Sequence, residues 1–281
     1  MKQRDFYIRL KLKKGIGYKG MNEVMDTLGD CPEITASLIQ EADLPDKLKN
    51  LVITAYKSTK LGQLVERILL QCDVLTFFDD VYPIQLKQMY QPPLILFARG
   101  NLNLLSKRIT VIVGSRNPTS YSTTTLKQLI PNLVKQDFVI ASGLAKGVDT
   151  IAHEQTLASN GQTIAVVGNG LNYFYPAKNR DLQKQIEKVG LVLSEYLPDT
   201  EPIPAYFPQR NRILAGLSEN VIVAEARKKS GSLITANIAL QENRNIFAIP
   251  GPLGSQLAEG PNYLIAAGAQ PIVNFDFKDM W

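Results

Sequence analysis

Positively charged side chains recur in this sequence just after short apolar segments, together with glycine and serine. One such stretch, Ser142-Gly143-Leu144-Ala145-Lys146-Gly147, follows the apolar run 138–141. Its glycines allow backbone angles and close approaches that a Cβ would prevent. Apolar positions after it recur at helical spacing, so a buried strand should lead through a glycine loop into a helix. Such a loop could be a plain turn, but the amide groups at a helix start, with Lys146 nearby, can also bind an anion.

The same combination follows other apolar runs, and the cations gather there. The charged residues in or near these segments are Arg116, Lys146, Lys178, Arg180, Arg210, Arg212, Arg227, Lys228 and Lys229. Neutral donors occur at Ser115, Ser142, Asn169 and Ser230-Gly231-Ser232, and aromatic rings at 173–175 and 206–207. Cations and amides bind phosphates, while aromatic faces stack on bases without reading their sequence. Any one of these residues could instead lie in a solvated turn or pack a loop, but the set favours a nucleic-acid surface.

Strand-like apolar runs precede these polar segments. They are expected at residues 109–113, 138–141, 163–167, 191–193, 220–224 and 245–249. Helical patterns separate most of them, which predicts a parallel sheet with helices on both faces. Ligands bind such sheets outside the carboxyl ends of the strands, so the polar segments should share one edge.

Two more strand-like runs, at 74–78 and 94–98, should extend the sheet beyond a plain Rossmann core. Residues 1 to about 70 read as small helices interrupted by glycine and proline. We therefore expect an α/β fold: an extended Rossmann-like, mostly parallel sheet with helices on both faces, preceded by a small all-helical domain. The expected domains are residues 1–70 and 71–281.

Within the helical region, Gly15-Ile16-Gly17 is similar to the hairpin of helix-hairpin-helix modules, whose backbone amides bind a phosphate. One tripeptide of this kind is common by chance. The alternative interpretation is a small packing or interaction module, and the sequence favours that alternative.

Composition limits the class of protein. The chain of 281 residues carries a net charge of +5, which weakly favours a polyanionic partner. Cys31 and Cys72 are isolated, as in a reduced cytoplasmic protein without a disulfide framework or zinc site. The N-terminus lacks the apolar core of a signal peptide, and no apolar run approaches the ~18 residues of a membrane span. A cytoplasmic protein is therefore expected.

Signals for catalysis are sparse. Near the polar edge the carboxylates are Asp149, Glu195 and Glu225, which could converge as a hydrolytic pair or simply orient arginines. No carboxylate cluster indicates a metal site, and the phosphate loop of nucleotide hydrolases is missing. The Gly168-Asn169-Gly170 turn lacks the third glycine of a dinucleotide fingerprint. His153, the only histidine, could act as a base but more often such a residue makes a local hydrogen bond.

Several longer motifs occur together in a particular order. They include the glycine stretch 142–149 with Ala152-His153, the run Phe207-Pro208-Gln209-Arg210-Asn211-Arg212-Ile213, and 230–236, with shorter pieces between and after them. In these motifs, from about residue 75 to 270, the chain resembles the DprA/Smf family of DNA processing proteins. The resemblance implies an extended Rossmann-like domain that binds single-stranded DNA without a nucleotide cofactor. It also implies a homodimer that shields incoming strands and loads RecA recombinase during natural transformation.

The resemblance also assigns DNA-binding positions. Carried over to this sequence, and completed by the neighbouring loops, they are Ser115, Arg116, Gly143, Lys146, Lys178, Arg210, Arg212, Ser230, Gly231 and Ser232. The chain departs from the family at Gln209, where arginine is usual, and at Asn169, where a small residue or cysteine is common. It also ends at Trp281, before the winged-helix domain of many relatives, so we expect that domain's function to be missing.

An enzymatic alternative belongs to a related Rossmann-like group that cleaves nucleoside monophosphates from their bases. That group uses a Pro-Gly-Gly-x-Gly-Thr loop. Here Pro250-Gly251 is followed by Pro252, and the motif does not occur elsewhere in the sequence. The sequence therefore favours a non-enzymatic DNA-binding protein.

The C-terminal part of the sheet domain carries more apolar positions than its helices need to cover one sheet edge. Ile238 and Leu240 lie in a predicted helix after the Ser230–Ser232 loop, and Ile265 lies in the last helix-like segment. Surplus apolar surface of this kind usually marks an interface. We expect these residues in a homodimer contact; the alternative is that they all belong to the core.

Overall fold

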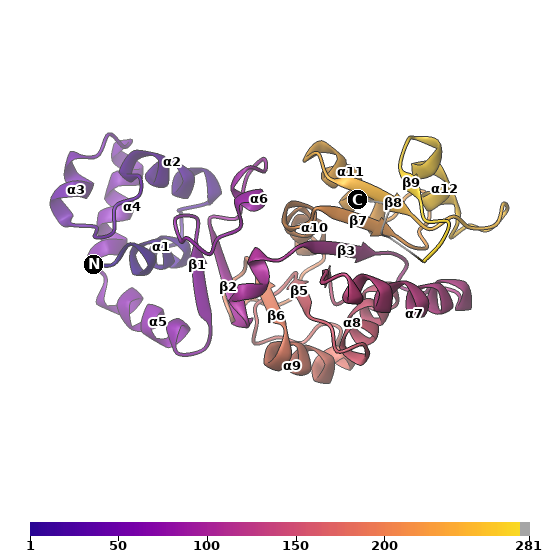
Figure 1. Cartoon of the computed structure of the whole chain (residues 1–281). Coiled ribbons are helices and arrows are strands. Elements are labelled where there is room, and N and C mark those ends of the chain that lie inside the picture. Colours follow the sequence, from indigo (N-terminus) through magenta and orange to yellow (C-terminus); the bar gives the residue numbers. More distant parts are fainter. Residues whose placement is uncertain (276–281) are drawn as a thin grey trace. The chain divides into compact units, whose positions relative to one another are not determined.

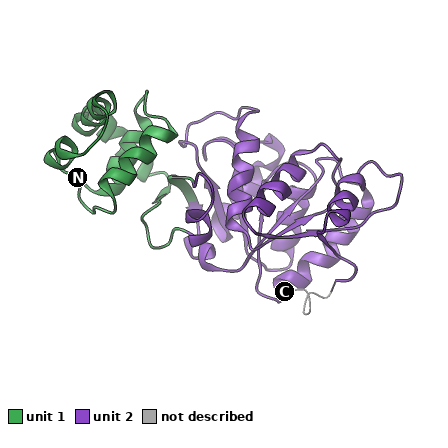
Figure 2. Ribbon diagram, turned by 90° about the horizontal axis from the view of Figure 1, so that it is seen from above, with its two compact units in different colours: residues 1–82, 93–98 green, residues 83–92, 99–281 purple. Residues whose placement is uncertain are grey.

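The computed structural model describes residues 1–275, which form two compact units (Figure 2). Unit 1 contains Met1–Tyr82 and Pro93–Ala98, and unit 2 contains Pro83–Pro92 and the chain from Arg99 onward. The boundary near residue 70 remains a prediction. Among the described residues no helix is both long and apolar enough to cross a membrane.

Unit 1 is mainly helical. Its helices are α1 (Gln3–Leu12), α2 (Tyr18–Leu28), α3 (Ala36–Glu41), α4 (Asp46–Lys57) and α5 (Thr59–Leu69). They surround a core in which Phe6, Tyr7, Ile8 and Leu10 are fully buried. A strand β1 (Asp73–Thr76) pairs antiparallel with β2 (Ile95–Gly100), whose first four residues belong to this unit. The Gly15-Ile16-Gly17 turn joins α1 to α2, and the favoured interpretation, a small packing or interaction module, remains a prediction.

Unit 2 is built on a parallel sheet. Its strands are β3 (Ile109–Val113), β4 (Val139–Ser142), β5 (Thr163–Val167), β6 (Leu191–Ser194), β7 (Asn220–Val223), β8 (Asn245–Ala248) and β9 (Gln270–Pro271). They lie side by side in the order β6-β5-β4-β3-β7-β8-β9. The residues of β3 to β7 are buried, as expected of strands covered on both faces.

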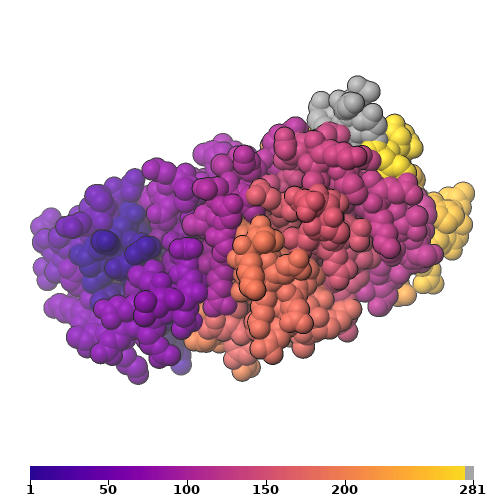
Figure 3. All heavy atoms as spheres, turned by 60° about the horizontal axis from the view of Figure 1, so that its bottom comes forward, coloured from indigo at the N-terminus to yellow at the C-terminus, as the bar shows by residue number. Residues whose placement is uncertain are grey.

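Helices cover both faces of this sheet (Figure 1). One face carries α7 (Ser120–Lys135), α8 (Val148–Ala158) and α9 (Arg180–Val189), which form its outer surface in Figure 3. The other carries α10 (Tyr206–Leu217) and α11 (Gly231–Gln241), while α12 (Glu259–Ala266) packs on β8. Shorter elements are α6 (Ile84–Lys87), η1 (Leu102–Ser106) and η2 (Ala177–Asn179). The expected fold class, a mostly parallel α/β sheet after a helical N-terminal region, is confirmed.

His153 lies on the buried side of α8. Its ring is fully buried, and Nδ1 lies 2.7 Å from Oγ1 of Thr163. The Thr163 hydroxyl donates its single proton to the carbonyl oxygen of Ile140, so Nδ1 of His153 must be the donor in their contact. The other ring nitrogen is buried and has no hydrogen-bond partner among residues 1–275. Burial, reinforced by the charge of Arg210, lowers the pKa of His153 to about 3.

This lowered pKa predicts a loss of stability in mild acid. Below about pH 6.5 the unfolded chain binds a proton that the folded chain excludes down to pH of about 3. The free energy of unfolding should therefore fall as the pH falls through this window, by about 1 kcal/mol per pH unit. Chemical denaturation of the wild type between roughly pH 7.5 and 5 measures the slope.

The matched variant is His153→Asn, which can keep a donor near Thr163 but does not titrate. It should be less stable at neutral pH, because it leaves a cavity, and its stability should depend less on pH. The titration of Asp149, whose pKa burial raises, is common to both proteins. Equal slopes for the two proteins would contradict this account of His153.

Candidate nucleic-acid interface

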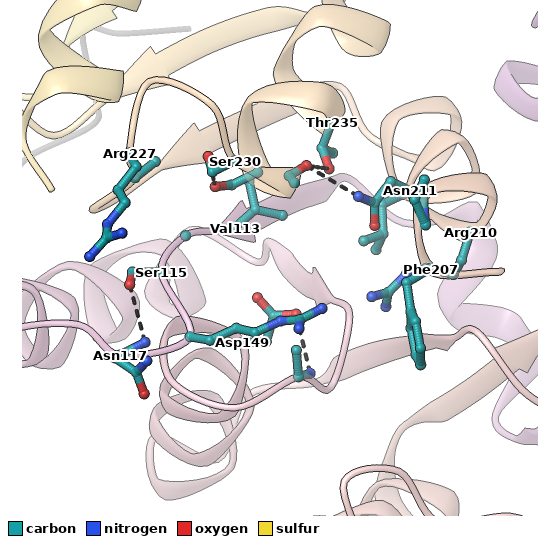
Figure 4. A pocket seen from close by; sticks show the side chains of 18 of the residues that line it. Val113, Ser115, Asn117, Asp149, Phe207, Arg210, Asn211, Arg227, Ser230 and Thr235 are labelled. Carbon is teal, nitrogen blue, oxygen red and sulfur yellow. Dashed lines mark hydrogen bonds between the residues drawn. The ribbon is translucent and has the colours of Figure 1, made fainter. Parts of the chain in front are cut away.

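The chain reverses direction across the sheet between β3 and β7. Strands β4, β5 and β6 follow β3 on one side, and α10 then carries the chain back to β7 on the other. The loops after β3 and β7 separate at this switch point, which is where open α/β sheets bind ligands. A cavity of about 470 Å³ lies there (Figure 4). Its lining includes Val113–Asn117, Ala145, Asp149, Tyr175, Phe207, Arg210, Asn211, Arg227, Ser230–Ser232 and Thr235.

The loop after β3 is held by a buried carboxylate. Glu225, two residues after the end of β7, accepts hydrogen bonds of 2.6 Å from both the backbone N–H and the hydroxyl of Thr119. The amide of Ser115 donates to the backbone carbonyl of Glu225, and the Ser115 hydroxyl accepts from the amide of Asn117. This frame fixes the backbone on both sides of Arg116, whose side chain is exposed.

The glycine loop between β4 and α8 is held by the side chain of Arg210. This arginine comes from α10, is 5% exposed, and donates from Nη1 to the carbonyl oxygen of Val166 at the end of β5. Its guanidinium lies directly over Gly143, where an added Cβ would overlap Nη1, Nη2 and Cζ. Glycine is therefore the only residue type at position 143 that leaves room for the Arg210 side chain where it lies.

Asp149 offsets part of the charge of the buried guanidinium. It lies in the first turn of α8 and accepts from the amide of Ala145 at 3.2 Å. Burial lowers the pKa of Arg210 to about 10, and the charge of Asp149 opposes that shift. Burial also raises the pKa of Asp149, although Arg210 and the loop amides favour its charged form. The two buried residues, which both line the cavity, thus offset part of each other's charge.

Asn179 ties the glycine loop to the start of α9. Its carboxamide is buried and donates to the carbonyl of Leu144 at 3.0 Å and to the hydroxyl of Thr150 at 2.9 Å. Thr150 in turn donates to the carbonyl of Ala145 at 2.7 Å. These bonds fix the backbone next to two exposed lysines, Lys146 and Lys178. Sequence reasoning missed Asn179, because a buried asparagine next to a proposed binding lysine carries no local signal.

The loop after β7 leads into α11 and contributes hydroxyls. Ser230 is the residue before the first turn of α11, and its hydroxyl lies 3.0 Å from that of Ser232. The carboxamide of Asn211 donates to the carbonyl of Gly231 at 3.2 Å. Asn117 and Thr235 also line the cavity but were not expected from the sequence. Both had a signal in the sequence, since Asn117 follows the Gly114-Ser115-Arg116 turn and Thr235 lies within the 230–236 motif.

Aromatic rings flank the same edge. Tyr175, which is 46% exposed, lies 5.1 Å from Phe207 between ring centroids, and both line the cavity. Tyr196 and Tyr206 stack at 4.0 Å. The Tyr196 hydroxyl donates to the side-chain oxygen of Gln209. Planar apolar surface is therefore available beside the cationic groups.

The structure brings some of the predicted site residues together and leaves others apart. Those that line the cavity are Ser115, Arg116, Arg210, Ser230, Gly231 and Ser232. Lys146 and Lys178 are exposed but outside its lining, and Gly143 lies under Arg210. Arg212 forms an ion pair of 2.5 Å with Glu195 and donates to the carbonyl of Gln91 at 2.8 Å. The DNA contacts of all these residues remain predictions.

The predicted dimer residues lie elsewhere in unit 2. Leu240 is 65% exposed and lines a cavity of about 260 Å³ together with Ile246 and Leu264. Ile238 and Ile265 are half-buried. The neighbouring side chains of Ile234 and Tyr263 are also exposed, so apolar surface does reach solvent on these helices.

Comparison with known proteins gives consistent matches. The model of the family described as DNA recombination-mediator protein A matches residues 73–280. The chain is 46% identical over 199 residues to DNA processing protein DprA of Streptococcus pneumoniae, which covers 71% of this chain and 70% of that protein. It is 45% identical to the Bacillus subtilis protein of the same name over 68% of this chain. The match covers 65% of the Bacillus subtilis protein and 51% of Protein Smf of Escherichia coli, so the chain spans only part of their length.

Two solved structures are similar as well. The X-ray structure of DprA from Streptococcus pneumoniae aligns over 99% of this chain and 98% of its own, with a TM-score of 0.87 and 36% identity. A structure of DprA from Helicobacter pylori, described as giving insight into that protein's single-stranded DNA binding mode, aligns over 73% of this chain and 93% of its own. Its TM-score is 0.66 and its identity 35%.

The contact between Gly143 and Arg210 predicts how glycine substitutions will behave. Gly143→Ala should reduce the free energy of unfolding by about 1–3 kcal/mol, because a buried guanidinium must move. Gly231→Ala is the matched control, since the nearest atom to its added Cβ is Nδ2 of Asn211 at 4.0 Å. Urea denaturation of both variants measures the difference. Equal stability of the two would show that Arg210 is not fixed over Gly143.

Proposed function

Because the chain belongs to the DNA recombination-mediator protein A family, we propose that it binds single-stranded DNA without sequence preference, using the basic edge of unit 2. The observation that carries this proposal is the cavity at the switch point. This cavity is lined by the exposed side chain of Arg116, by Ser115 and Ser230, and by the rings of Tyr175 and Phe207. Cations and hydroxyls suit a phosphate backbone, and aromatic faces suit unpaired bases.

The framework of the site supports binding rather than hydrolysis. Asp149 is engaged by the glycine loop and Arg210, Glu195 by Arg212, and Glu225 by Thr119. Each of these three carboxylates therefore positions a loop or a cation. We accordingly propose a non-enzymatic role, and expect no free base when the protein is incubated with nucleoside monophosphates.

We further propose that the bound strand is protected and passed to RecA recombinase during natural transformation, in the cytoplasm. Support comes from family membership and from the names of the relatives, which refer to DNA processing. A mediator of this kind must hold the strand through its backbone and leave many base edges accessible. The cationic side chains around the switch point suit that requirement.

A homodimer completes the proposal. The exposed side chains of Ile234, Leu240 and Tyr263, with the cavity beside Leu240, offer an apolar surface in unit 2. Burying such a surface against a second copy would be favourable. Two basic edges in one dimer could then hold a longer strand than either edge alone.

The direct test is a salt-titrated binding assay with single- and double-stranded DNA of one length. We expect the single strand to bind more tightly, because the aromatic rings can stack only on unpaired bases. Changing the sequence of the strand should alter the affinity little. Equal or tighter binding of a blunt duplex in the same buffer would refute the proposal.

Single substitutions test the assigned cations. Arg116→Ala and Lys146→Ala should each weaken binding to every sequence and flatten the slope of log affinity against log salt by up to ~0.7. Lys107→Ala is the control, because Lys107 is exposed just before β3 begins, at the opposite edge of the sheet. If both site variants are folded and keep the wild-type affinity and slope, neither residue belongs to the interface.

The dimer is tested by charge substitution. Light scattering should show that the wild type is dimeric at micromolar concentration and that the double variant Leu240→Glu, Ile265→Glu is monomeric, because two carboxylates cannot be buried unpaired. Val189→Glu, at a 53% exposed residue of α9, is the control and should remain dimeric. A monomeric wild type, or a folded double variant that stays dimeric, would show that this interface is wrong.

A further inference from the structure

Helix α9 carries a row of cations on its outer side. Arg180, Lys184 and Lys188 are all exposed and are spaced four residues apart. Residues at this spacing lie one above another on a helix, with a rise of about 6 Å per step. We call these three residues the α9 ridge.

The ridge has no ionic partner in the part of the chain that the structure describes. Of the two carboxylates on α9, Glu187 lies 3.8 Å from Arg99 and accepts from Gln183 at 3.0 Å. Asp181 stands in the first turn, where a negative charge suits the positive end of the helix. Like charges four residues apart repel, so the ridge does not stabilise α9 by itself. An external anion would relieve this repulsion.

An aromatic ring anchors the first half of the ridge. The guanidinium of Arg180 lies 5.2 Å from the centroid of Phe174, and the ammonium of Lys184 lies 5.9 Å from it. Phe174 belongs to the loop after β5 and is half-buried. The cations are therefore held near one another and beside an apolar ring, and less side-chain entropy is lost when they bind a ligand.

The ridge is continuous with the candidate interface. Lys178 lies in η2, immediately before α9, and Asn179 ties that turn to the glycine loop. Strands β5 and β6 are parallel, so α9 between them runs back toward the opposite edge of the sheet. The ridge thus begins beside Lys178 and leads away from the cavity along one face of unit 2.

We propose that the α9 ridge carries the phosphate backbone of the strand segment that leaves the switch-point cavity. This inference rests on the proposed function and extends it to a track along α9. Phosphates of an extended strand recur at a distance similar to one ridge step, so successive cations can meet successive phosphates. A row that continues from Lys178 suits a linear polyanion better than the compact acidic patch of a protein.

The track has a consequence for strand length. A strand of about six nucleotides can fill the cavity without reaching the far end of α9, whereas one of about twenty can follow the ridge. Affinity should therefore be higher for the longer strand, by more than is expected from the larger number of positions at which that strand can bind. The slope of log affinity against log salt should also be steeper for the longer strand. The cations of the ridge alone should control this increment.

The test uses the full chain and oligothymidylates of about six and about twenty nucleotides. Lys184→Glu with Lys188→Glu should weaken binding of the long strand at least about fivefold and reduce its salt slope by up to about 1.4, which is ~0.7 for each lost phosphate contact. The short strand should bind within twofold of the wild type. The matched control, Lys127→Glu with Lys135→Glu, removes two exposed lysines of α7 and should leave the length effect intact.

Two results would overturn the inference. If the ridge variant loses no more affinity for the long strand than the control variant does, the ridge does not bind DNA. It is then a solvent-exposed helix face or a binding surface for an acidic protein. If the short strand weakens as much as the long one, the ridge does not act on the outgoing segment. If the wild type binds neither strand, the proposed function itself is wrong. This outcome differs from the two above, in which the wild type binds DNA.

Discussion

The candidate interface depends on the interactions that the buried guanidinium of Arg210 makes with its surroundings. An isolated charge is costly to bury, so a 5% exposed arginine must be compensated by its surroundings. Here the compensation comes from the carboxylate of Asp149 and the carbonyl of Val166, and the space comes from the missing side chain at Gly143. Three elements, β5, α8 and α10, therefore meet at one planar group. The glycine loop gains a fixed shape from a contact that its own sequence does not contain.

A buried polar frame of this kind supports an exposed charged surface. Glu225 holds the loop that carries Arg116, and Asn179 joins the loops that carry Lys146 and Lys178. The exposed cations thus stand on backbone that is already ordered before any ligand binds. Preorganised groups lose less entropy on binding, which favours affinity without demanding a sequence.

At the two positions where the chain departs from the family pattern, both side chains make hydrogen bonds within the protein. The side-chain oxygen of Gln209 accepts from the Tyr196 hydroxyl, and the Asn169 carboxamide donates to the carbonyl of Tyr173 at 2.9 Å.

The sequence predicted the framework well and the partners of individual side chains poorly. Runs such as 109–113 and 163–167 are apolar enough to be read as buried strands, and each is a strand at those residues. From these strands it was possible to predict that the polar segments share one edge of the sheet, because parallel strands place their carboxyl ends together. Arg210 and Arg212, two residues apart, look equivalent in the sequence, yet one is buried over Gly143 and the other pairs with Glu195. Such partners come from distant segments, and no local pattern records them.

The central claim, that single-stranded DNA binds at the strand-end edge of unit 2, is tested most directly by lysine footprinting. The protein would be acetylated with and without a saturating single-stranded oligonucleotide, and modification at each lysine measured by mass spectrometry. Lys146 and Lys178 should become protected, whereas Lys107 and Lys135, exposed away from that edge, should be modified equally in both samples. Unchanged modification of Lys146 and Lys178 in a fully bound sample would contradict the account.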